Sequence, residues 1–218
     1  MQLSSCPLCD HPDINHYYKD TSEHHGSDFY QCQRCRLIFA PPEDRPSPEE
    51  EFERYETHEN DPGDERYRRF LNQLAEPMNE LLEPESEGLD FGSGPGPTLN
   101  ILFQGQGHRM RIYDPFYAND RSVFENTYDF ITATEVVEHL FCPGKELGRL
   151  WRCLRPGGYL GIMTEMPRDN RSFFADWHYR LDLTHVTFFT KTTFRWLASH
   201  WDALLTFHGN RVIIFRKS

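Results

Sequence analysis

The stretch "LDFGSGPGP", residues 89–97, most constrains the fold of this chain of 218 residues. A short apolar segment precedes the glycines, and Pro97 stands where a helix would begin, as in a strand–loop–helix unit. Loops of this kind usually bind phosphate, because free backbone N–H groups and the helix dipole attract an anion. Asp90 would repel a phosphate, and Pro97 has no N–H to donate. The loop therefore predicts a ligand with a cationic end.

Helical and strand-like segments alternate along the chain from residue 64 onward. This alternation predicts an α/β fold with a Rossmann-like open, mostly parallel sheet and helices on both faces. The strand-like segments 203–208 and 211–217 are expected to close the sheet as an antiparallel pair. The other expected strands are 88–91, 109–114, 128–134 and 159–165; the expected helices are 64–82, with a kink or break near Pro77, the segment after the glycine loop, 144–154 and 191–200.

Four acidic residues stand at the ends of expected strands: Asp90, Asp114, Glu135 and Glu165. In open parallel sheets, ligands bind outside the carboxyl ends of the strands. Asp114 lies 20 residues after Gly94, close to the offset of about 20 residues at which an acid binds ribose hydroxyls in this architecture. S-adenosylmethionine has an ammonium, a sulfonium and a ribose but no phosphate, so it fits this set of acids.

Four motifs of the chain resemble class I S-adenosylmethionine-dependent methyltransferases, over about residues 64–218. "LDFGSGPGP" is similar to the first cofactor motif of that family and "IYD" to its ribose-binding acid. "YDFITATEVVEHL" resembles the fourth-strand motif, and "LRPGGYLGIMTE" resembles the turn between a helix and the fifth strand. Four segments in the right order are far more specific than one glycine loop.

The resemblance implies roles for residues of the cofactor site. Asp90 would hold the ammonium of the cofactor through the loop or a water molecule. Gly92, Gly94 and Gly96 would let the backbone approach the methionine and ribose portions. Glu135 would lie near the sulfonium side, while Glu138 and His139 in the same motif are expected to cap and orient the following turn.

The chain departs from the family pattern after the ribose acid. Members usually place a helix and a third strand there, with a residue that contacts adenine. Only the 13 residues 115–127 separate Asp114 from Tyr128, so that strand must be missing, short or irregular. The segment that begins with Pro115 and Phe116 is therefore predicted to bind the cofactor, with Phe116 or Tyr117 stacking on adenine. Packing beneath the sheet edge is the alternative role for these rings.

Two C-x-x-C pairs near the start predict a zinc site: Cys6, Cys9, Cys32 and Cys35. Zinc favours four thiolates in a tetrahedron, and each C-x-x-C turn presents two sulfurs. Four protein ligands leave no open position, so the zinc would be structural. A redox role is the alternative, but two copies outside a βαβ context do not favour it.

The composition divides the chain into three parts. Residues 1–40 are predicted to form a small zinc ribbon, because they have too few aliphatic residues for a core of their own. Residues 41–63 are predicted to be an acidic, proline-rich linker, with one exposed helix after Ser47 and Pro48. Residues 64–218 would form the methyltransferase domain.

An aromatic-rich segment, residues 171–189, is expected to cover the acceptor of the methyl group, as the segment after the fifth strand often does in the family. Methyl transfer from a sulfonium needs a base only if the acceptor must lose a proton. His185, Tyr179 and His178 are the candidate bases. Alternatively, Asp182 and His185 pair with each other and only pin the segment.

These features favour methyl transfer to a small-molecule acceptor. An RNA methyltransferase is the second hypothesis, in which the ribbon grips nucleic acid and arginines contact phosphates. A cofactor-binding protein without catalysis is the third. The candidate phosphate contacts are Arg66, Arg68 and Arg69, or Arg149, Arg152 and Arg155.

The charge and hydropathy of the chain restrict its surroundings. The formal net charge is -11, but residues 41–65 carry most of it, so the overall acidity says little about nucleic-acid binding. No apolar run approaches the length of a membrane span, and the first ten residues lack the features of a signal peptide. We therefore expect a cytoplasmic protein with no membrane contact.

Overall fold

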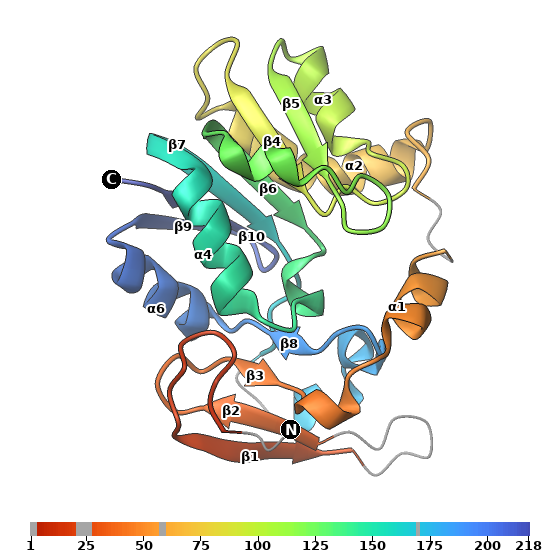
Figure 1. Ribbon diagram of the computed structural model, residues 1–218, viewed down its shortest axis with the longest axis vertical. Helices are drawn as coiled ribbons and strands as arrows, with labels where there is room; N and C mark the ends of the chain where they lie inside the picture. The colour runs from red at the N-terminus through yellow and green to blue at the C-terminus, as the bar shows by residue number, and fades with distance from the viewer. Residues whose placement is uncertain (1–3, 21–27, 57–59, 169–170) are drawn as a thin grey trace.

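The computed structural model describes residues 4–20, 28–56, 60–168 and 171–218. Two sheets organise these residues, a large one of six strands and a small one of four. Figure 1 shows the small sheet at one end of the molecule and the large sheet at the other. None of the described helices is long and apolar enough to cross a membrane.

The large sheet confirms the predicted Rossmann-like architecture. Its first four strands are parallel, β10 runs antiparallel to β7, and β9 pairs with β10 as the predicted antiparallel closing pair. In spatial order, the strands are β5 (Arg109–Tyr113), β4 (Glu87–Phe91), β6 (Tyr128–Thr134), β7 (Leu154–Met163), β10 (Val212–Arg216) and β9 (Leu204–His208).

Helices cover both faces of the large sheet, because successive strand residues point to opposite faces. On β6, Ile131 packs in the apolar cluster that contains Leu147 of α4 (Pro143–Cys153) and Leu197 of α6 (Lys191–Trp201). The preceding residue, Phe130, packs in the opposite cluster with residues of α2 (Glu65–Asn79) and α3 (Leu99–Gly105). The sheet is thus buried on both sides, as its continuous apolar runs require.

Two local expectations are resolved by the structure. The segment between Asp114 and Tyr128 contains no strand; it forms a turn and the short helix η2 (Arg121–Glu125), and β5 remains the edge of the sheet. The missing third strand is therefore confirmed. The expected break near Pro77 is wrong, because α2 continues through Pro77 to Asn79. Pro77 lies so close to the end of α2 that it interrupts little of the helical hydrogen bonding.

The small sheet joins the cysteine-bearing segment to the large domain. It contains β1 (Ile14–Lys19), β2 (Asp28–Cys32), β3 (Ile38–Phe39) and β8 (Thr187–Phe188), all antiparallel. The fourth strand, β8, comes from the segment that follows β7. A buried ion pair also links the two parts, since Arg180 Nη1 lies 2.5 Å from Asp20 Oδ2.

The acidic segment contains the helix that its start signal predicts. After η1 (Pro42–Asp44), α1 (Pro48–Tyr55) begins at Ser47, whose side chain accepts a hydrogen bond from Glu50 N, while the backbone N–H of Ser47 donates one to the Glu50 carboxylate. This capping box satisfies two backbone donors. Figure 1 shows α1 at the side of the molecule, between the small sheet and α2.

The remaining short elements follow the long strands. They are η3 (Val137–His139) after β6, and α5 (Arg171–Asp176) and η4 (His178–Leu181) between β7 and β8. Thr187 of β8 donates a side-chain hydrogen bond of 2.8 Å to the carbonyl of Val137. These elements bring the segments after β6 and β7 together at the carboxyl ends of the parallel strands.

Candidate active site

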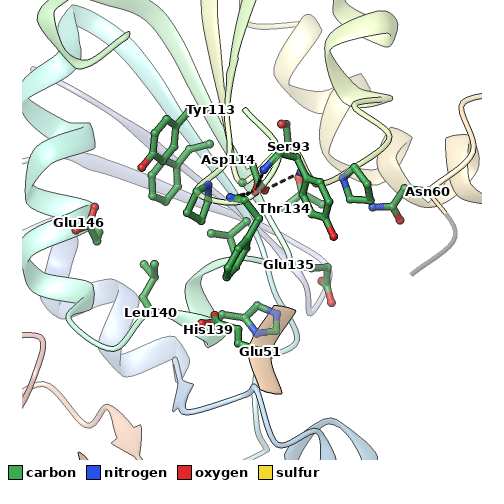
Figure 2. A pocket seen from close by; sticks show the side chains of 18 of the residues that line it. Glu51, Asn60, Ser93, Tyr113, Asp114, Thr134, Glu135, His139, Leu140 and Glu146 are labelled. Atoms are coloured by element: carbon green, nitrogen blue, oxygen red, sulfur yellow. Dashed lines mark hydrogen bonds between the residues drawn. The ribbon is translucent and has the colours of Figure 1, made fainter. Parts of the chain in front are cut away.

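A cavity of about 770 Å³ lies at the carboxyl ends of β4, β5 and β6. Its wall combines the loops after these strands with side chains from α1, α2, α4 and the segment before β8. Figure 2 shows Ser93 and Asp114 in one part of this wall, with Glu51 and His139 farther from the glycine loop. The wall includes residues 91–95, 113–117, 134–136 and 139–142, together with Glu51, Asn60, Tyr67, Phe70, Asp182 and His185.

The glycine positions of the loop have little room for a side chain, and each glycine faces a different neighbour. Gly92 and Gly94 line the cavity, with φ angles of +82° and +65°. A Cβ on Gly92 would lie 2.3 Å from Val136, and one on Gly96 would lie 1.7 Å from the carbonyl oxygen of Asn60. Gly92 therefore fits the loop against the segment after β6, and Gly96 fits it against the segment before α2.

Asp114 links the glycine loop to the turn after β5. Its Oδ2 accepts a hydrogen bond of 2.9 Å from Gly94 N, and its Oδ1 accepts from Phe116 N at 2.9 Å and Tyr117 N at 3.1 Å. A carboxylate oxygen has two lone-pair sites, so these bonds orient the group and leave it able to accept from a ligand hydroxyl. Asp114, Pro115 and Phe116 all line the cavity.

The rings after Asp114 contact the helix of the acidic segment. Phe52 of α1 lies 5.6 Å from Phe116 and 6.2 Å from Tyr117, measured between ring centroids. The Tyr117 hydroxyl donates a hydrogen bond of 2.8 Å to Glu56. The cavity is therefore bordered by a segment that the sequence predicted to be a linker.

Only two of the four strand-end acids line the cavity. Asp114 and Glu135 do, whereas Asp90 and Glu165 are not among the described lining residues. Asp90 lies beneath the glycine loop and accepts a hydrogen bond of 2.9 Å from the Thr132 hydroxyl. Burial raises the pKa of Asp90 to about 7. Glu165 accepts hydrogen bonds from Trp177 at 3.0 Å and Arg211 at 2.5 Å.

Glu135 follows β6 with a left-handed backbone, φ 51°, which turns the chain into η3. Its Oε2 accepts a hydrogen bond of 3.1 Å from the Tyr179 hydroxyl, and its Oε1 lies 3.8 Å from Arg211 Nη1. Burial raises the pKa of Glu135 to about 7, although the charge of Arg211 opposes the shift. A protonatable carboxyl group therefore lies in the cavity wall.

A model of a methyltransferase domain family matches residues 57–202, two thirds of the chain. The chain belongs to this methyltransferase domain family. It is an S-adenosylmethionine-dependent methyltransferase, so the resemblance seen in its motifs is confirmed. A search of curated proteins found no match.

Solved structures share the fold of this methyltransferase at low sequence identity. One is the Burkholderia thailandensis 1,6-didemethyltoxoflavin-N1-methyltransferase with bound 1,6-didemethyltoxoflavin and S-adenosylhomocysteine, at 16% identity and a TM-score of 0.51, over 86% of this chain and 98% of that one. Another is human N-acetylserotonin methyltransferase in complex with S-adenosylmethionine, at 14% identity and a TM-score of 0.50, over 70% of this chain and 53% of that one.

Of the three candidate bases of the methyltransferase, His185 lines the cavity. Its Nδ1 lies 2.6 Å from the carbonyl oxygen of Tyr179. Tyr179 is buried behind the wall and, with the exposed His178, borders a second pocket of about 480 Å³. The Asp182 carboxylate, which was the alternative partner for His185, accepts hydrogen bonds from Arg54 at 2.9 and 2.7 Å.

Glu138 also belongs to the site, although the sequence predicted only that it would cap a turn. It is 1% exposed, accepts a hydrogen bond of 3.0 Å from the Thr164 hydroxyl and contacts the hydroxyl of Tyr179. Burial raises the pKa of both Glu138 and Tyr179 well above their usual values. The sequence signal for this role was the motif "EVVEH", in which Glu135 and Glu138 are three residues apart. In the fold, both carboxyl groups reach the hydroxyl of Tyr179.

The four predicted zinc ligands lie together. The Sγ atoms of Cys6 and Cys35 are 3.5 Å apart and those of Cys9 and Cys32 are 3.6 Å apart, and all four lie within 4.8 Å of one another. Thiolates at about 2.3 Å from a tetrahedral zinc are separated by about 3.8 Å. The donor set therefore fits a structural zinc ion, with all four positions filled by the protein.

Two of the arginines proposed to contact RNA form pairs within the protein. Arg155 binds Asp129 at 2.8 Å and Glu87 at 2.7 Å. Arg149 pairs with Glu146, and its guanidinium lies 3.6 Å from the ring centroid of Phe124. Both arginines thus have intramolecular roles.

Substitution of Cys6 by serine is expected to release one zinc ion per chain and to lower the melting temperature by roughly 10 °C or more. The effect should extend beyond residues 1–40, because Cys6 shares an apolar cluster with Leu197 of α6 and β3 pairs with β8. Metal analysis and thermal unfolding measure both effects. Cys142→Ser is the matched control, since Cys142 is exposed and outside the cluster. Fresh wild-type protein without zinc would contradict the site.

Proposed function

We propose that this methyltransferase transfers the methyl group of S-adenosylmethionine to a small molecule that binds in the same cavity. The observation that carries the proposal is the size of the cavity. Sites for small ligands span about 300–1,000 Å³, and about 770 Å³ is available. The names of the two structural neighbours also refer to small acceptors, 1,6-didemethyltoxoflavin and N-acetylserotonin.

Residues of the glycine loop and of the turn after β5 would hold the cofactor. S-adenosylmethionine supplies a methyl group that is bound to a sulfonium. When the carbon–sulfur bond breaks, its electron pair stays on sulfur. Asp114, fixed by three backbone N–H groups, would accept a hydrogen bond from a ribose hydroxyl at the remaining site of Oδ2. Phe116 or Tyr117 would stack on adenine. Asp90 would favour the ammonium from beneath the loop.

The acceptor would lie on the side of the cavity bordered by α1 and His185. Arg54 of α1 reaches across to Asp182, and Phe52 packs on Phe116, so α1 is held at the mouth from two sides. Because transfer from a sulfonium is a direct displacement, positioning supplies most of the acceleration. His185 would remove a proton from acceptors that need it, with Tyr179 and His178 as the other candidates.

The domain division remains part of the proposal: zinc ribbon 1–40, acidic segment 41–63 and methyltransferase domain 64–218. The contacts of α1 and the pairing of β3 with β8 support a joint role of the three parts in enclosing the acceptor. An RNA acceptor has weaker support, because Arg149 and Arg155 pair with acidic residues of the protein.

Radiolabelled S-adenosylmethionine, carrying the label on its methyl group, tests the acceptor class. The enzyme is incubated with it and with a cell extract that is then separated into low-mass, RNA and protein fractions. We expect enzyme-dependent label in the low-mass fraction, because the size of the cavity suits a small acceptor beside the cofactor. Asp114→Ala protein is the matched control. Label confined to the RNA fraction would contradict the proposal and favour the second hypothesis.

A further inference from the structure

Glu138, His139 and His185 form a second cluster of metal-ligand side chains, separate from the four cysteines. One donor atom from each of the three residues lies within 4.8 Å of the other two. The rings of His139 and His185 are 4.7 Å apart, measured between centroids. His139 and His185 line the large cavity, with Glu138 behind them. We call these three residues the Glu–His–His cluster.

The fold fixes the two segments that carry the cluster. Glu138 and His139 belong to η3, and His185 precedes β8. The backbone N–H of Val186 donates a hydrogen bond of 2.8 Å to the carbonyl of Glu138, and the Thr187 hydroxyl donates to that of Val137. These bonds hold the two segments against each other, as a preformed site requires.

Hydrogen bonds to the backbone set the tautomers of both histidines. Nδ1 of His139 lies 3.0 Å from the carbonyl oxygen of Thr184, and Nδ1 of His185 lies 2.6 Å from that of Tyr179. A carbonyl oxygen only accepts, so each Nδ1 carries the proton and donates it. The neutral rings then carry their lone pairs on Nε2. A hydrogen bond of this kind is the usual outer support of a histidine that ligates metal through its other nitrogen.

The carboxylate of Glu138 completes a set that suits a divalent metal. It is 1% exposed and is oriented by hydroxyl groups of Thr164 and Tyr179. A buried carboxylate is costly unless it is paired or coordinates a metal. Two imidazoles and one carboxylate are a ligand set for divalent transition metals such as Mn²⁺ or Fe²⁺, and three protein ligands leave positions open for a substrate oxygen.

We propose that the Glu–His–His cluster binds a divalent transition-metal ion, and that the acceptor of the methyl group is a hydroxyl compound that ligates this ion. The acceptor class rests on the proposed function. A metal lowers the pKa of a bound hydroxyl group, which prepares it for attack on the sulfonium methyl.

Residues of the cavity wall can accept the proton that the methyl transfer releases. Because Nε2 of His185 ligates the metal in this arrangement and its Nδ1 carries a proton, Glu135 replaces His185 as the base. The acceptor hydroxyl loses its proton to the Glu135 carboxylate, whose Oε1 is buried with no hydrogen-bond partner among the described residues and lies 3.8 Å from Arg211. The acceptor oxygen forms a bond to the methyl carbon while the carbon–sulfur bond breaks. Its electron pair goes to sulfur, which yields S-adenosylhomocysteine and a methyl ether.

Titration of the zinc-loaded full chain with Mn²⁺, followed by the electron paramagnetic resonance signal of free Mn²⁺, tests the cluster. Mn²⁺ prefers oxygen and nitrogen ligands over thiolates, so the cysteine site should not compete. We expect one Mn²⁺ per chain. His139→Asn and His185→Asn should each weaken its binding at least about tenfold, because asparagine can keep the hydrogen bond to the carbonyl but lacks Nε2. His208→Asn, on exposed β9, should bind like the wild type.

Zinc content and S-adenosylhomocysteine binding show whether the variants are folded. If either histidine variant is misfolded, Glu138→Gln, which keeps the shape of the side chain, is tested in its place. It should also weaken Mn²⁺ binding at least about tenfold. No saturable Mn²⁺ site, or unchanged Mn²⁺ binding in the folded variants, would overturn the proposal. S-adenosylhomocysteine binding without Mn²⁺ binding would remove only the metal site, whereas failure to bind S-adenosylhomocysteine would count against the proposed function itself.

Discussion

Replacing Asp90 with asparagine is expected to raise the free energy of unfolding at pH 8 by up to about 4 kcal/mol. Burial raises the pKa of Asp90 from 3.8 to about 7 in the folded chain, with a hydrogen bond from Thr132 opposing the shift and the charge of Asp114 adding to it. The folded carboxyl group therefore binds its proton more tightly than the unfolded one. Stability falls as the pH rises from about 4 to 7, and asparagine removes this loss.

Urea unfolding of the cofactor-free protein at several pH values measures the effect. The gain from Asp90→Asn should be small near pH 4, grow up to pH 7 and then stay constant. Asp129→Asn is a control of opposite sign. Although burial opposes it, bonds from Glu87 N and Arg155 lower the pKa of Asp129, so that variant should lose stability at pH 8. An Asp90→Asn protein less stable than the wild type at pH 8 would contradict the account.

Asp114→Ala is expected to weaken the binding of S-adenosylhomocysteine by about 1 to 3 kcal/mol, or roughly 5- to 150-fold. The variant removes the group proposed to bind the ribose. It also removes the acceptor that ties Gly94 to Phe116 and Tyr117, so the two halves of the cofactor site lose their connection. Isothermal titration calorimetry measures the change.

Asp120→Ala is the matched control for Asp114. Asp120 also accepts a backbone hydrogen bond, 3.0 Å from Ser122 N, but it is exposed and outside the described cavity wall. Its loss should leave cofactor affinity unchanged. Unchanged affinity in a folded Asp114→Ala protein would remove the ribose role.

The large domain could be predicted because its strands, helices and turns each depend on residues close together in the sequence. Alternating apolar patterns and the glycine loop identify the strands and helices of a Rossmann-like sheet, and the short segment 115–127 excludes a third strand at the edge. The capping signal at Ser47 predicts α1 for the same reason. The four cysteines are predictable because zinc geometry restricts the spacing of its ligands.

Contacts between distant segments could not be predicted in this way. β3 and β8 have two residues each, too few for a pattern, and pair across about 150 residues of chain. Charge and proline content gave α1 a linker role, whereas Phe52 and Arg54 contact the cavity rim. Glu138 was expected to cap and orient a turn. Its burial depends on Thr164 and Tyr179, which only the folded chain brings near it.

Titration of the wild-type protein with S-adenosylhomocysteine is the most direct test of the central claim, that the acidic glycine loop and Asp114 form a pocket for the methyl donor and its product. NAD and ATP serve as comparison ligands because both contain adenosine, and both carry phosphates that the Asp114 carboxylate in the cavity wall should repel. We predict one S-adenosylhomocysteine bound per chain and no heat from NAD or ATP. Binding of NAD or ATP, or no binding of S-adenosylhomocysteine to folded, zinc-loaded protein, would contradict the claim.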